Sequence, residues 1–221
     1  MPRTDRNPKT PDRLDNGSRG NDRHLKFTTP SRWIARFAPL IGRGGPVLDL
    51  ACGGGRHASH LLGLGHEVWA VDLRTAPIRD RLGNRPKLNI VEIDLEDGSN
   101  PFSPENALGG VAFAGIVVSN YLWRPLFDGL LNALAEEGVL IHETFAIGNE
   151  AISKPRDPNH LLQPGELLDR LSGRLQIIAY ESGIVSDEAP IGVKQRIVGV
   201  KNLETGLRED GLPAPVALPG V

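Results

Sequence analysis

A glycine-rich turn that follows directly on an aspartate is the first stretch of this sequence whose residue types could do chemistry. The segment "VLDLACGGGRH" (47–57) carries Asp49 in an apolar run and then supplies Gly53 and Gly55. A turn of this kind lets the backbone approach a nucleotide-shaped cofactor, either a dinucleotide or a methyl donor. Because a carboxylate would repel a pyrophosphate and would suit an ammonium group, Asp49 favours the methyl donor.

Two more carboxylates close the next two apolar runs. Asp72 ends "HEVWAVDL" (66–73), 23 residues after Asp49, and Asp94 lies in "LNIVEIDL" (88–95). Open α/β sheets bind ligands outside the carboxyl ends of their strands, so Asp72 can accept both hydroxyls of a ribose and Asp94 can reach an adenine amino group. A cationic group, a diol and an adenine together describe S-adenosylmethionine. The sequence therefore predicts this cofactor, with S-adenosylhomocysteine as its product.

The predicted cofactor site extends to the neighbours of these carboxylates. Arg56 opens the helix after the turn, where the helix dipole disfavours a cation, so it is either a solvated charge or a partner for a carboxylate of cofactor or substrate. The single cysteine, Cys52, excludes an internal disulfide and a multi-cysteine zinc site, and no metal is expected. The residues predicted to bind the cofactor are Asp49, Ala51, Cys52, Gly53, Gly55, Arg56, Asp72, Leu73, Asp94, Leu95 and Asn120.

Polar residues at the ends of two later strands indicate where an acceptor could bind. In "HETF" (142–145), strand alternation puts His142 and Glu143 on opposite faces. A polar side chain on a buried central strand requires a reason, and acceptor binding by Glu143 competes with simple exposure at the strand end. The catalytic candidates are Glu143, His142 and Tyr121. The predicted substrate contacts are Arg124, His160 and Trp123, the last being either an acceptor wall or core packing.

Apolar periodicity alternates strands with helices along the body of the chain. It predicts helices over 31–41, 56–65, 76–83, 125–137 and 164–173, and strands over 46–51, 66–73, 88–95, within 110–121, and over 138–145, 175–182 and 193–201. Such alternation specifies a mostly parallel sheet covered on both faces. The connection between Ser182 and Val193 is about ten residues without a helical pattern, which is too short for a parallel crossover. The seventh strand should therefore run antiparallel to the sixth.

The motifs together resemble class I S-adenosylmethionine-dependent methyltransferases, and within them the bacterial group similar to tellurite-resistance methyltransferases. The resemblance covers about 30–202 and rests on "VLDLACGGGRH", "VWAVDL", "SNYLWRPLF" and "ETFAIGNEAISKPRDPNHLLQPGELL", followed by "YESG" and "QRIVGV". It implies a Rossmann-like three-layer α/β sandwich with strand order 3-2-1-4-5-7-6. It also implies acceptor contacts from the loops after strands four and five. Ala51 departs from the class, which usually has its first glycine there, but alanine is small enough to fit.

Composition and charge bound the domain organisation. The net charge is −2, and residues 1–24 carry six Lys/Arg against four Asp, which leaves the rest of the chain at −4. The first 24 residues contain one Leu and no Val, Ile or aromatic residue, so they cannot bury enough apolar surface to offset their ordering entropy. We expect a disordered extension over 1–24, a methyltransferase domain over 25–202 and a loose tail over 203–221. No run has the length of a membrane span and no signal peptide is evident, so a cytoplasmic location is expected.

These features together predict transfer of a methyl group to a small-molecule acceptor, whether a thiol, a chalcogen oxyanion, a hydroxyl or an amine. An RNA or protein methyltransferase is an alternative that would need a basic face, which the acidic body disfavours. A protein that binds the cofactor without catalysis is another, and a nicotinamide-dependent enzyme is the least favoured. The expected partner is a small molecule rather than nucleic acid or membrane, and the chain is expected to be a monomer or homodimer.

Overall fold

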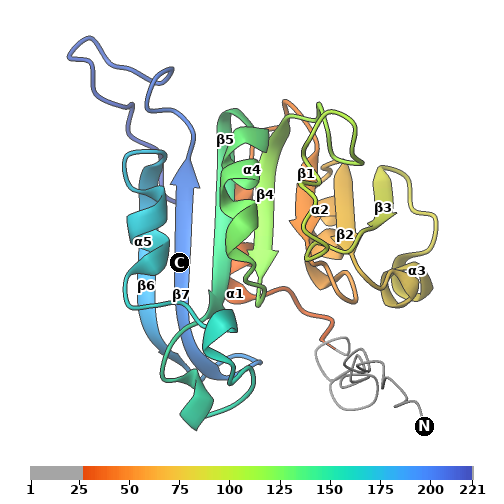
Figure 1. Ribbon diagram of the computed structural model, residues 1–221. Coiled ribbons are helices and arrows are strands. Elements are labelled where there is room, and N and C mark those ends of the chain that lie inside the picture. Colours follow the sequence, from red (N-terminus) through yellow and green to blue (C-terminus); the bar gives the residue numbers. More distant parts are fainter. Residues whose placement is uncertain (1–26, 221) are drawn as a thin grey trace, which may run out of the picture.

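The computed structural model describes residues 27–220, in which seven strands form one twisted sheet (Figure 1). The strand order is β3-β2-β1-β4-β5-β7-β6, as predicted. Strands β1 to β5 pair in parallel, and β7 runs antiparallel to both β5 and β6, which confirms the argument from the short last connection. The strands are β1 (Val47–Leu50), β2 (Val68–Asp72), β3 (Leu88–Glu92), β4 (Phe113–Ser119), β5 (Leu134–Phe145), β6 (Gln176–Val185) and β7 (Gly192–Val200).

Helices connect most of the parallel strands. They are α1 (Arg32–Phe37), α2 (Arg56–Gly63), α3 (Ala76–Leu82), α4 (Phe127–Ala133) and α5 (Glu166–Leu171), with short 3₁₀ turns η2 (Ala38–Leu40), η3 (Arg124–Leu126), η4 (Asn149–Ala151) and η5 (Pro158–His160). Ser31 caps α1, since its hydroxyl accepts a hydrogen bond from the Ile34 N–H at 3.2 Å. These positions agree with the predicted helices to within a few residues, except for α4.

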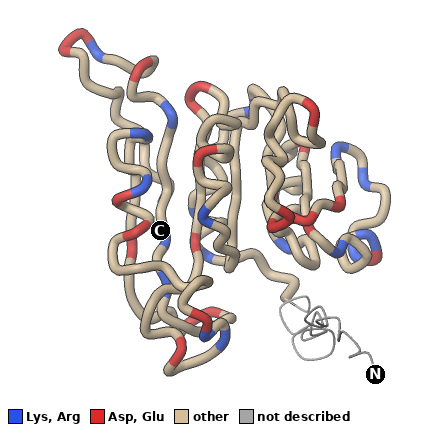
Figure 2. The backbone as a smooth tube through the Cα atoms, in the orientation of Figure 1, with Lys and Arg blue, Asp and Glu red and all other residues tan. Residues whose placement is uncertain are grey.

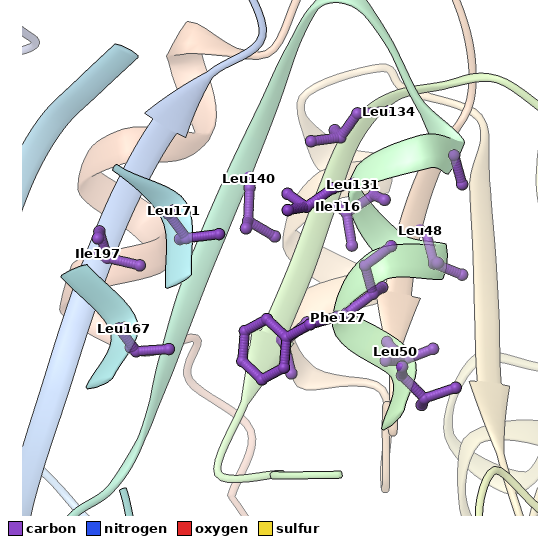
Figure 3. Packing of buried hydrophobic residues seen from close by; sticks show 14 of the residues in the cluster. Leu48, Leu50, Ile116, Phe127, Leu131, Leu134, Leu140, Leu167, Leu171 and Ile197 are labelled. Carbon is purple, nitrogen blue, oxygen red and sulfur yellow. The ribbon is translucent and has the colours of Figure 1, made fainter. Parts of the chain in front are cut away.

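Two apolar clusters cover the two faces of the sheet, which gives the three layers that the resemblance implies. On one face, leucines of α4 and α5 pack on Leu140 of β5 and Ile116 of β4 (Figure 3). On the other face, Trp33 and Phe37 of α1 pack with residues of α2, α3 and the sheet. The middle strands are thus buried on both sides, whereas β3 and β6 at the two edges of the sheet are partly exposed.

The helix predicted over 125–137 is shorter in the structure than its pattern indicates. α4 ends at Ala133, and Leu134 already pairs with Phe113 as the first residue of β5. The chain then bends at Glu137, whose φ is 60°, and Gly138 lies so close to the neighbouring backbone that an added Cβ would be 2.7 Å from the Ala135 carbonyl oxygen. Strand pairing with β4 outweighs the helical pattern of "ALAEE".

Of the two predicted tails, the extension over 1–24 lies outside the described residues. Over 203–220 the chain has no helix or strand; there Val216 packs on the second apolar cluster, whereas Leu218 is 63% exposed. In the described range, no helix is long and apolar enough to cross a membrane, and no group of three metal-binding side chains comes together. Lys/Arg and Asp/Glu positions are interspersed along this part of the chain (Figure 2).

Candidate functional site

The turn between β1 and α2 has the backbone conformation that its glycines permit. Ala51, Gly53 and Gly55 all have positive φ, of 55°, 54° and 73°. At Gly55 a Cβ would lie 2.6 Å from the Ile78 side chain of α3, so only glycine fits without displacement. The alanine at position 51 adopts the left-handed conformation all the same. The turn is therefore tight, and it lies at the carboxyl edge of β1.

Asp72 ties this turn to the end of β2. One carboxylate oxygen accepts the Gly53 N–H at 2.8 Å, and the other accepts the Arg74 N–H at 3.0 Å. Each carboxylate oxygen has a second lone pair, so both can still accept a hydroxyl hydrogen from a ligand. The side chain is only partly buried and lies beside the glycine turn, as the spacing predicts. It also shapes that turn, which the sequence did not indicate.

Asp49 is more deeply buried than a direct cofactor contact requires. Its side chain is 1% exposed, and its carboxylate accepts the Ala58 N–H of α2 at 2.8 Å and lies 4.0 Å from the His57 ring. Burial raises the pKa of this carboxyl to about 7, against the lowering effects of the Ala58 N–H and of Arg56. Asp49 thus supports the first turn of α2 behind the glycine turn, and its contact with an ammonium group stays a prediction.

The end of β4 carries a buried polar atom without a partner. Asn120 has a φ of 56°, and its N–H donates to the Glu143 carbonyl oxygen at 2.8 Å. Within residues 27–220, the buried Oδ1 of Asn120 has no hydrogen-bond partner. Burial raises the pKa of the neighbouring Tyr121, and Glu96, which accepts its hydroxyl hydrogen, and Asp94 act in the same direction. Strain and unsatisfied polar groups at one position are typical of a ligand site.

The other predicted cofactor residues follow β2 and β3, apart from Cys52 in the turn. Leu73 is 57% exposed, and Leu95 is buried. Asp94 is exposed and accepts the Glu96 N–H at 3.0 Å. Cys52 is buried, and burial raises the pKa of its thiol, so the thiol is neutral. Its backbone N–H donates to Val71, which joins the turn to β2.

Arg56 is not the solvated charge that was one of its two interpretations. It is 9% exposed, and its guanidinium donates to Ser119 Oγ at 3.3 Å and to the Thr29 carbonyl oxygen at 3.4 Å. Its guanidinium carbon also lies 5.6 Å from the ring centroid of Phe27. Burial lowers the pKa of Arg56, while Glu143 acts first among the carboxylates that raise it. The side chain points from α2 toward the ends of β4 and β5.

Glu143 belongs to an ionic network, centred on Arg196, that the sequence did not predict. It is 0% exposed; one oxygen accepts the Ser119 hydroxyl at 2.8 Å, and the other lies 3.3 Å from Arg196 Nε of β7. Arg196 also pairs with Glu181 at 3.5 Å and with Glu188. Lys194 and Arg196 are charged residues at alternate positions of the apolar segment "VKQRIVGV". This pattern could have indicated the network, since a charged residue in an apolar strand is also what drew attention to Glu143.

The other acceptor-side candidates have defined structural contacts. His142 lies on the opposite face from Glu143, stacks on Phe127 of α4 with ring centroids 5.6 Å apart, and has its Nε2 3.3 Å from the Tyr121 carbonyl oxygen. Burial lowers the pKa of His142 to about 4, so the ring is neutral at pH 7. Its role as a base stays a prediction, and its surroundings are those of a packing residue.

Arg124 holds the long loop after β5. It makes a two-pronged pair with Glu166, with both nitrogen–oxygen distances 2.8 Å, and donates to the carbonyl oxygens of Asn159 and Leu161. Burial opposes ionisation of Glu166, but Arg124, the Gln163 N–H and Arg170 outweigh it and lower the pKa of Glu166 to about 2. His160 lies in η5 within the same loop. Trp123 packs, partly buried, against the α4 and α5 cluster.

The structure thus brings the predicted residues together in two groups along the carboxyl edge. The glycine turn follows β1, Asp72 ends β2, and Asn120 and Tyr121 follow β4, so this group lies at the ends of three neighbouring strands. Glu143 and Arg56 form the other, at β4, β5 and β7. Arg124 and His160 lie in the loop that follows β5 and contact neither group through the hydrogen bonds described for residues 27–220.

No protein-family model matches the sequence, and no curated protein matches it either. Solved structures do. The structure concerned with conversion of a disulfide bond into a thioacetal group during echinomycin biosynthesis is similar with a TM-score of 0.58 and 19% identity, over 80% of this chain and 84% of that one. TehB from Haemophilus influenzae has a TM-score of 0.57 and 15% identity, over 76% of this chain and 61% of that one.

The glycopeptide N-methyltransferase MtfA complexed with S-adenosylmethionine is similar with a TM-score of 0.51 and 22% identity, over 75% of this chain and 85% of that one. At these identities the likeness concerns the fold. Together with the strand order and the reversed β7, it shows that the chain has the fold of the class I S-adenosylmethionine-dependent methyltransferases.

Proposed function

We propose that this protein transfers a methyl group from S-adenosylmethionine to a small-molecule acceptor. The observation that carries the proposal is the group of residues at the carboxyl ends of β1, β2 and β4. There, a turn with three positive φ angles, a carboxylate with free lone pairs and the buried Asn120 Oδ1, which has no partner in the described chain, follow three neighbouring strands at one edge of the sheet. A dinucleotide would need a turn free of carboxylates for its pyrophosphate.

The residues present fit the proposed cofactor. Asp72 would accept the ribose hydroxyls, since both of its oxygens retain a lone pair. The exposed Leu73 would cover one side of the adenine, and Asp94 would lie near its amino group. Asn120 Oδ1 is an acceptor without a donor in the described chain, and an ammonium or hydroxyl would satisfy it. That a solved structure of this fold, the MtfA complex, contains S-adenosylmethionine supports the same assignment.

The chemistry asks little of the protein beyond placement. S-adenosylmethionine, when bound, supplies a methyl group already activated by the positively charged sulfur. The chain then has to hold an acceptor in line with that methyl group and exclude water. Tyr121 and Asn120 lie where β4 ends, between the turn and Glu143, and can line the path between the two substrates. Glu143, held by Ser119 and Arg196, is a fixed carboxylate that can orient a hydroxyl or amine.

Calorimetry and methyl transfer test the proposal in two steps. Titration of the full chain with S-adenosylmethionine, S-adenosylhomocysteine and NAD should show binding of the first two and not of NAD. Transfer of label from the methyl donor should then be screened over thiols, chalcogen oxyanions, phenols and amines. Tighter binding of NAD than of the methyl donor would overturn the proposal. Binding without transfer to any acceptor would instead favour a non-catalytic protein.

A further inference from the structure

The side chain of His142 is buried on the face of the sheet that α4 covers. It is 2% exposed, and its ring stacks on Phe127 of α4, which Figure 3 shows in this layer. In the pairing of β5 with β4, His142 lies opposite Val118, two residues before Asn120. A buried polar group costs stability unless it is hydrogen-bonded, so the contacts of the two ring nitrogens decide what His142 does.

The contacts of the ring nitrogens fix the tautomer of His142. Nε2 lies 3.3 Å from the Tyr121 carbonyl oxygen. Because a carbonyl oxygen only accepts, Nε2 carries the ring hydrogen and donates it. Nδ1 is then the nitrogen without a hydrogen, and it is buried with no hydrogen-bond partner in residues 27–220. Burial lowers the pKa of His142 to about 4, so the ring holds this neutral tautomer at pH 7.

This arrangement does not favour a general base. In the neutral ring only Nδ1 can take a proton, and a proton taken there would leave a charge buried beside Phe127. A general base also has to lie within hydrogen-bond reach of the proton that it removes. Glu143, the proposed contact of the acceptor, points to the opposite face of β5 from His142. The directed contact of His142 is thus its hydrogen bond to Tyr121.

The Tyr121 carbonyl belongs to a strained turn at the end of β4. Asn120 has a φ of 56°, in the left-handed region that residues with a Cβ disfavour. β5 holds this turn at two points: the Glu143 carbonyl oxygen accepts the Asn120 N–H at 2.8 Å, and the His142 ring donates to the Tyr121 carbonyl. The torsion angles of Asn120 and Tyr121 lie between these two bonds. Since a strained conformation persists only where its surroundings hold it, both bonds are needed.

We propose that His142 is a positioning residue for the methyl donor, whose Nε2–H holds the Asn120–Tyr121 turn in the conformation that binds this donor. The role toward the donor rests on the proposed function, whereas the hold on the turn rests on the contacts alone. Asn120 Oδ1, the buried acceptor without a partner in the described chain, is the atom that this turn would offer to the donor. Loss of the His142 bond should let Asn120 relax and weaken donor binding, although His142 itself does not contact the donor.

Two measurements on the full chain test the hold on the turn without any methyl donor. Nitrogen NMR at pH 7, with His142→Gln used to assign the signals, should show a neutral His142 ring with its hydrogen on Nε2. Exchange of the Asn120 N–H with solvent should be about tenfold faster in His142→Phe than in wild type, which is the effect of losing one hydrogen bond of ordinary strength. A hydrogen on Nδ1, or equal exchange rates, would overturn the inference.

Calorimetric titration with S-adenosylmethionine separates the hydrogen bond from the packing. His142→Phe keeps a ring against Phe127 and removes the Nε2–H, so it should weaken donor binding by about tenfold. His142→Gln keeps an N–H donor and should retain most of the affinity. Phe127→Leu is the matched control: it removes the stacking and leaves the hydrogen bond, so it should lower the melting temperature and leave donor affinity unchanged. If His142→Phe fails to fold, the more adaptable His142→Met takes its place.

The outcomes distinguish this inference from the proposed function. Equal donor affinity in wild type, His142→Phe and His142→Gln would overturn the inference and leave the proposed function standing. Normal donor affinity with lost turnover in His142→Gln would show a base and would also overturn the inference. Faster Asn120 exchange in His142→Phe, without donor binding by wild type, would overturn the proposed function and the role toward the donor, and would leave the hold on the turn standing.

Discussion

The two halves of the carboxyl edge are built in different ways. At β1, β2 and the glycine turn, backbone N–H groups and nearby carboxylates make the contacts, as between Gly53 and Asp72 or between Ala58 and Asp49. At β5, β6 and β7, side-chain ion pairs join segments far apart in sequence, as between Arg196 and Glu143, and Glu188 accepts the backbone N–H of Arg32, 156 residues away. The first half is local and mostly main-chain, and the second is long-range and charged.

The two halves therefore differ in how many substitutions they tolerate. A turn held by backbone conformation tolerates few substitutions and suits a ligand of fixed shape, such as a cofactor. A surface held by paired side chains changes its charge and shape with single substitutions, so it suits a substrate that differs among proteins of one fold. The predictions below test whether substitutions in the first half disturb a rigid backbone, and whether substitutions in the second half change its charge without disturbing the fold.

The largest effect is expected at the glycine turn. Gly55→Ala adds a Cβ at a φ of 73°, 2.6 Å from Ile78, so it combines a strained backbone with overpacking. We expect a loss of about 3 kcal/mol in the free energy of unfolding, measured by urea denaturation. Gly63→Ala in the same helix is the control: nothing lies within 4 Å of its Cβ, and it should be neutral or stabilising by up to about 1 kcal/mol. Similar effects of both changes would mean that the turn is not rigid.

Asp72→Asn should weaken binding of the methyl donor by about 1.5–3 kcal/mol, the usual size for hydrogen bonds to a charged group. The amide can still accept one of the two backbone N–H groups, so the melting temperature should fall less than it would for Asp72→Ala. Glu92→Gln is the control, since Glu92 lies opposite Asp72 in the pairing of β2 with β3 but binds Thr75 instead. Calorimetry that shows normal donor binding by a destabilised Asp72→Asn would make Asp72 structural.

The same contrast explains how far sequence reasoning reached. The glycine turn and the carboxylates beside it could be placed from the sequence because their signals are local: glycines after a strand, and acids at strand ends at regular spacing. The reversed β7 followed from the length of one loop. The burial of Arg56 could not be predicted, because it depends on Ser119 and Phe27, which only the fold brings beside it. Nor could the pairing of Glu143 with Arg196, although Glu143 stood out as a charge in an apolar strand.

The pH dependence of the free energy of unfolding distinguishes two interpretations of Asp49, as a contact of the methyl donor and as a support for α2. Its folded pKa of about 7 lies above the unfolded value of about 3.9, so the folded state binds the proton more tightly. Its contribution to stability is therefore present below about pH 4 and is lost as the pH rises toward 7. Compared with Asp49→Asn, the wild type should lose about 2 kcal/mol of unfolding free energy between pH 5.5 and 8. The buried His142 lies on another strand and contributes equally in both proteins, so it cancels in the difference.

Urea denaturation of both proteins at the two pH values measures this difference, and adding the methyl donor sharpens it. An ammonium group beside Asp49 would favour the charged carboxylate, so saturating donor should reduce the wild-type loss. An unchanged loss would show that Asp49 only supports α2. Parallel pH profiles of wild type and Asp49→Asn without donor would show that the carboxyl is ionised throughout, contrary to its burial.

The smallest effect is expected at Glu143, which belongs to the charged half at β5, β6 and β7 and is the proposed contact of the acceptor. Glu143→Gln keeps the volume and the hydrogen bond from Ser119 and removes one charge, while Arg196 retains Glu181 and Glu188. We expect turnover at least tenfold lower, about 1.4 kcal/mol of barrier, with donor affinity unchanged, because the proposed donor contacts lie on other strands. Glu136→Gln, at the exposed opposite end of β5, is the matched control for steady-state kinetics and donor titration. Normal turnover with weakened donor binding would mean that Glu143 contacts the methyl donor. Normal turnover with normal donor binding would make Glu143 a structural support for Arg196, and the acceptor would then have to be oriented by other residues.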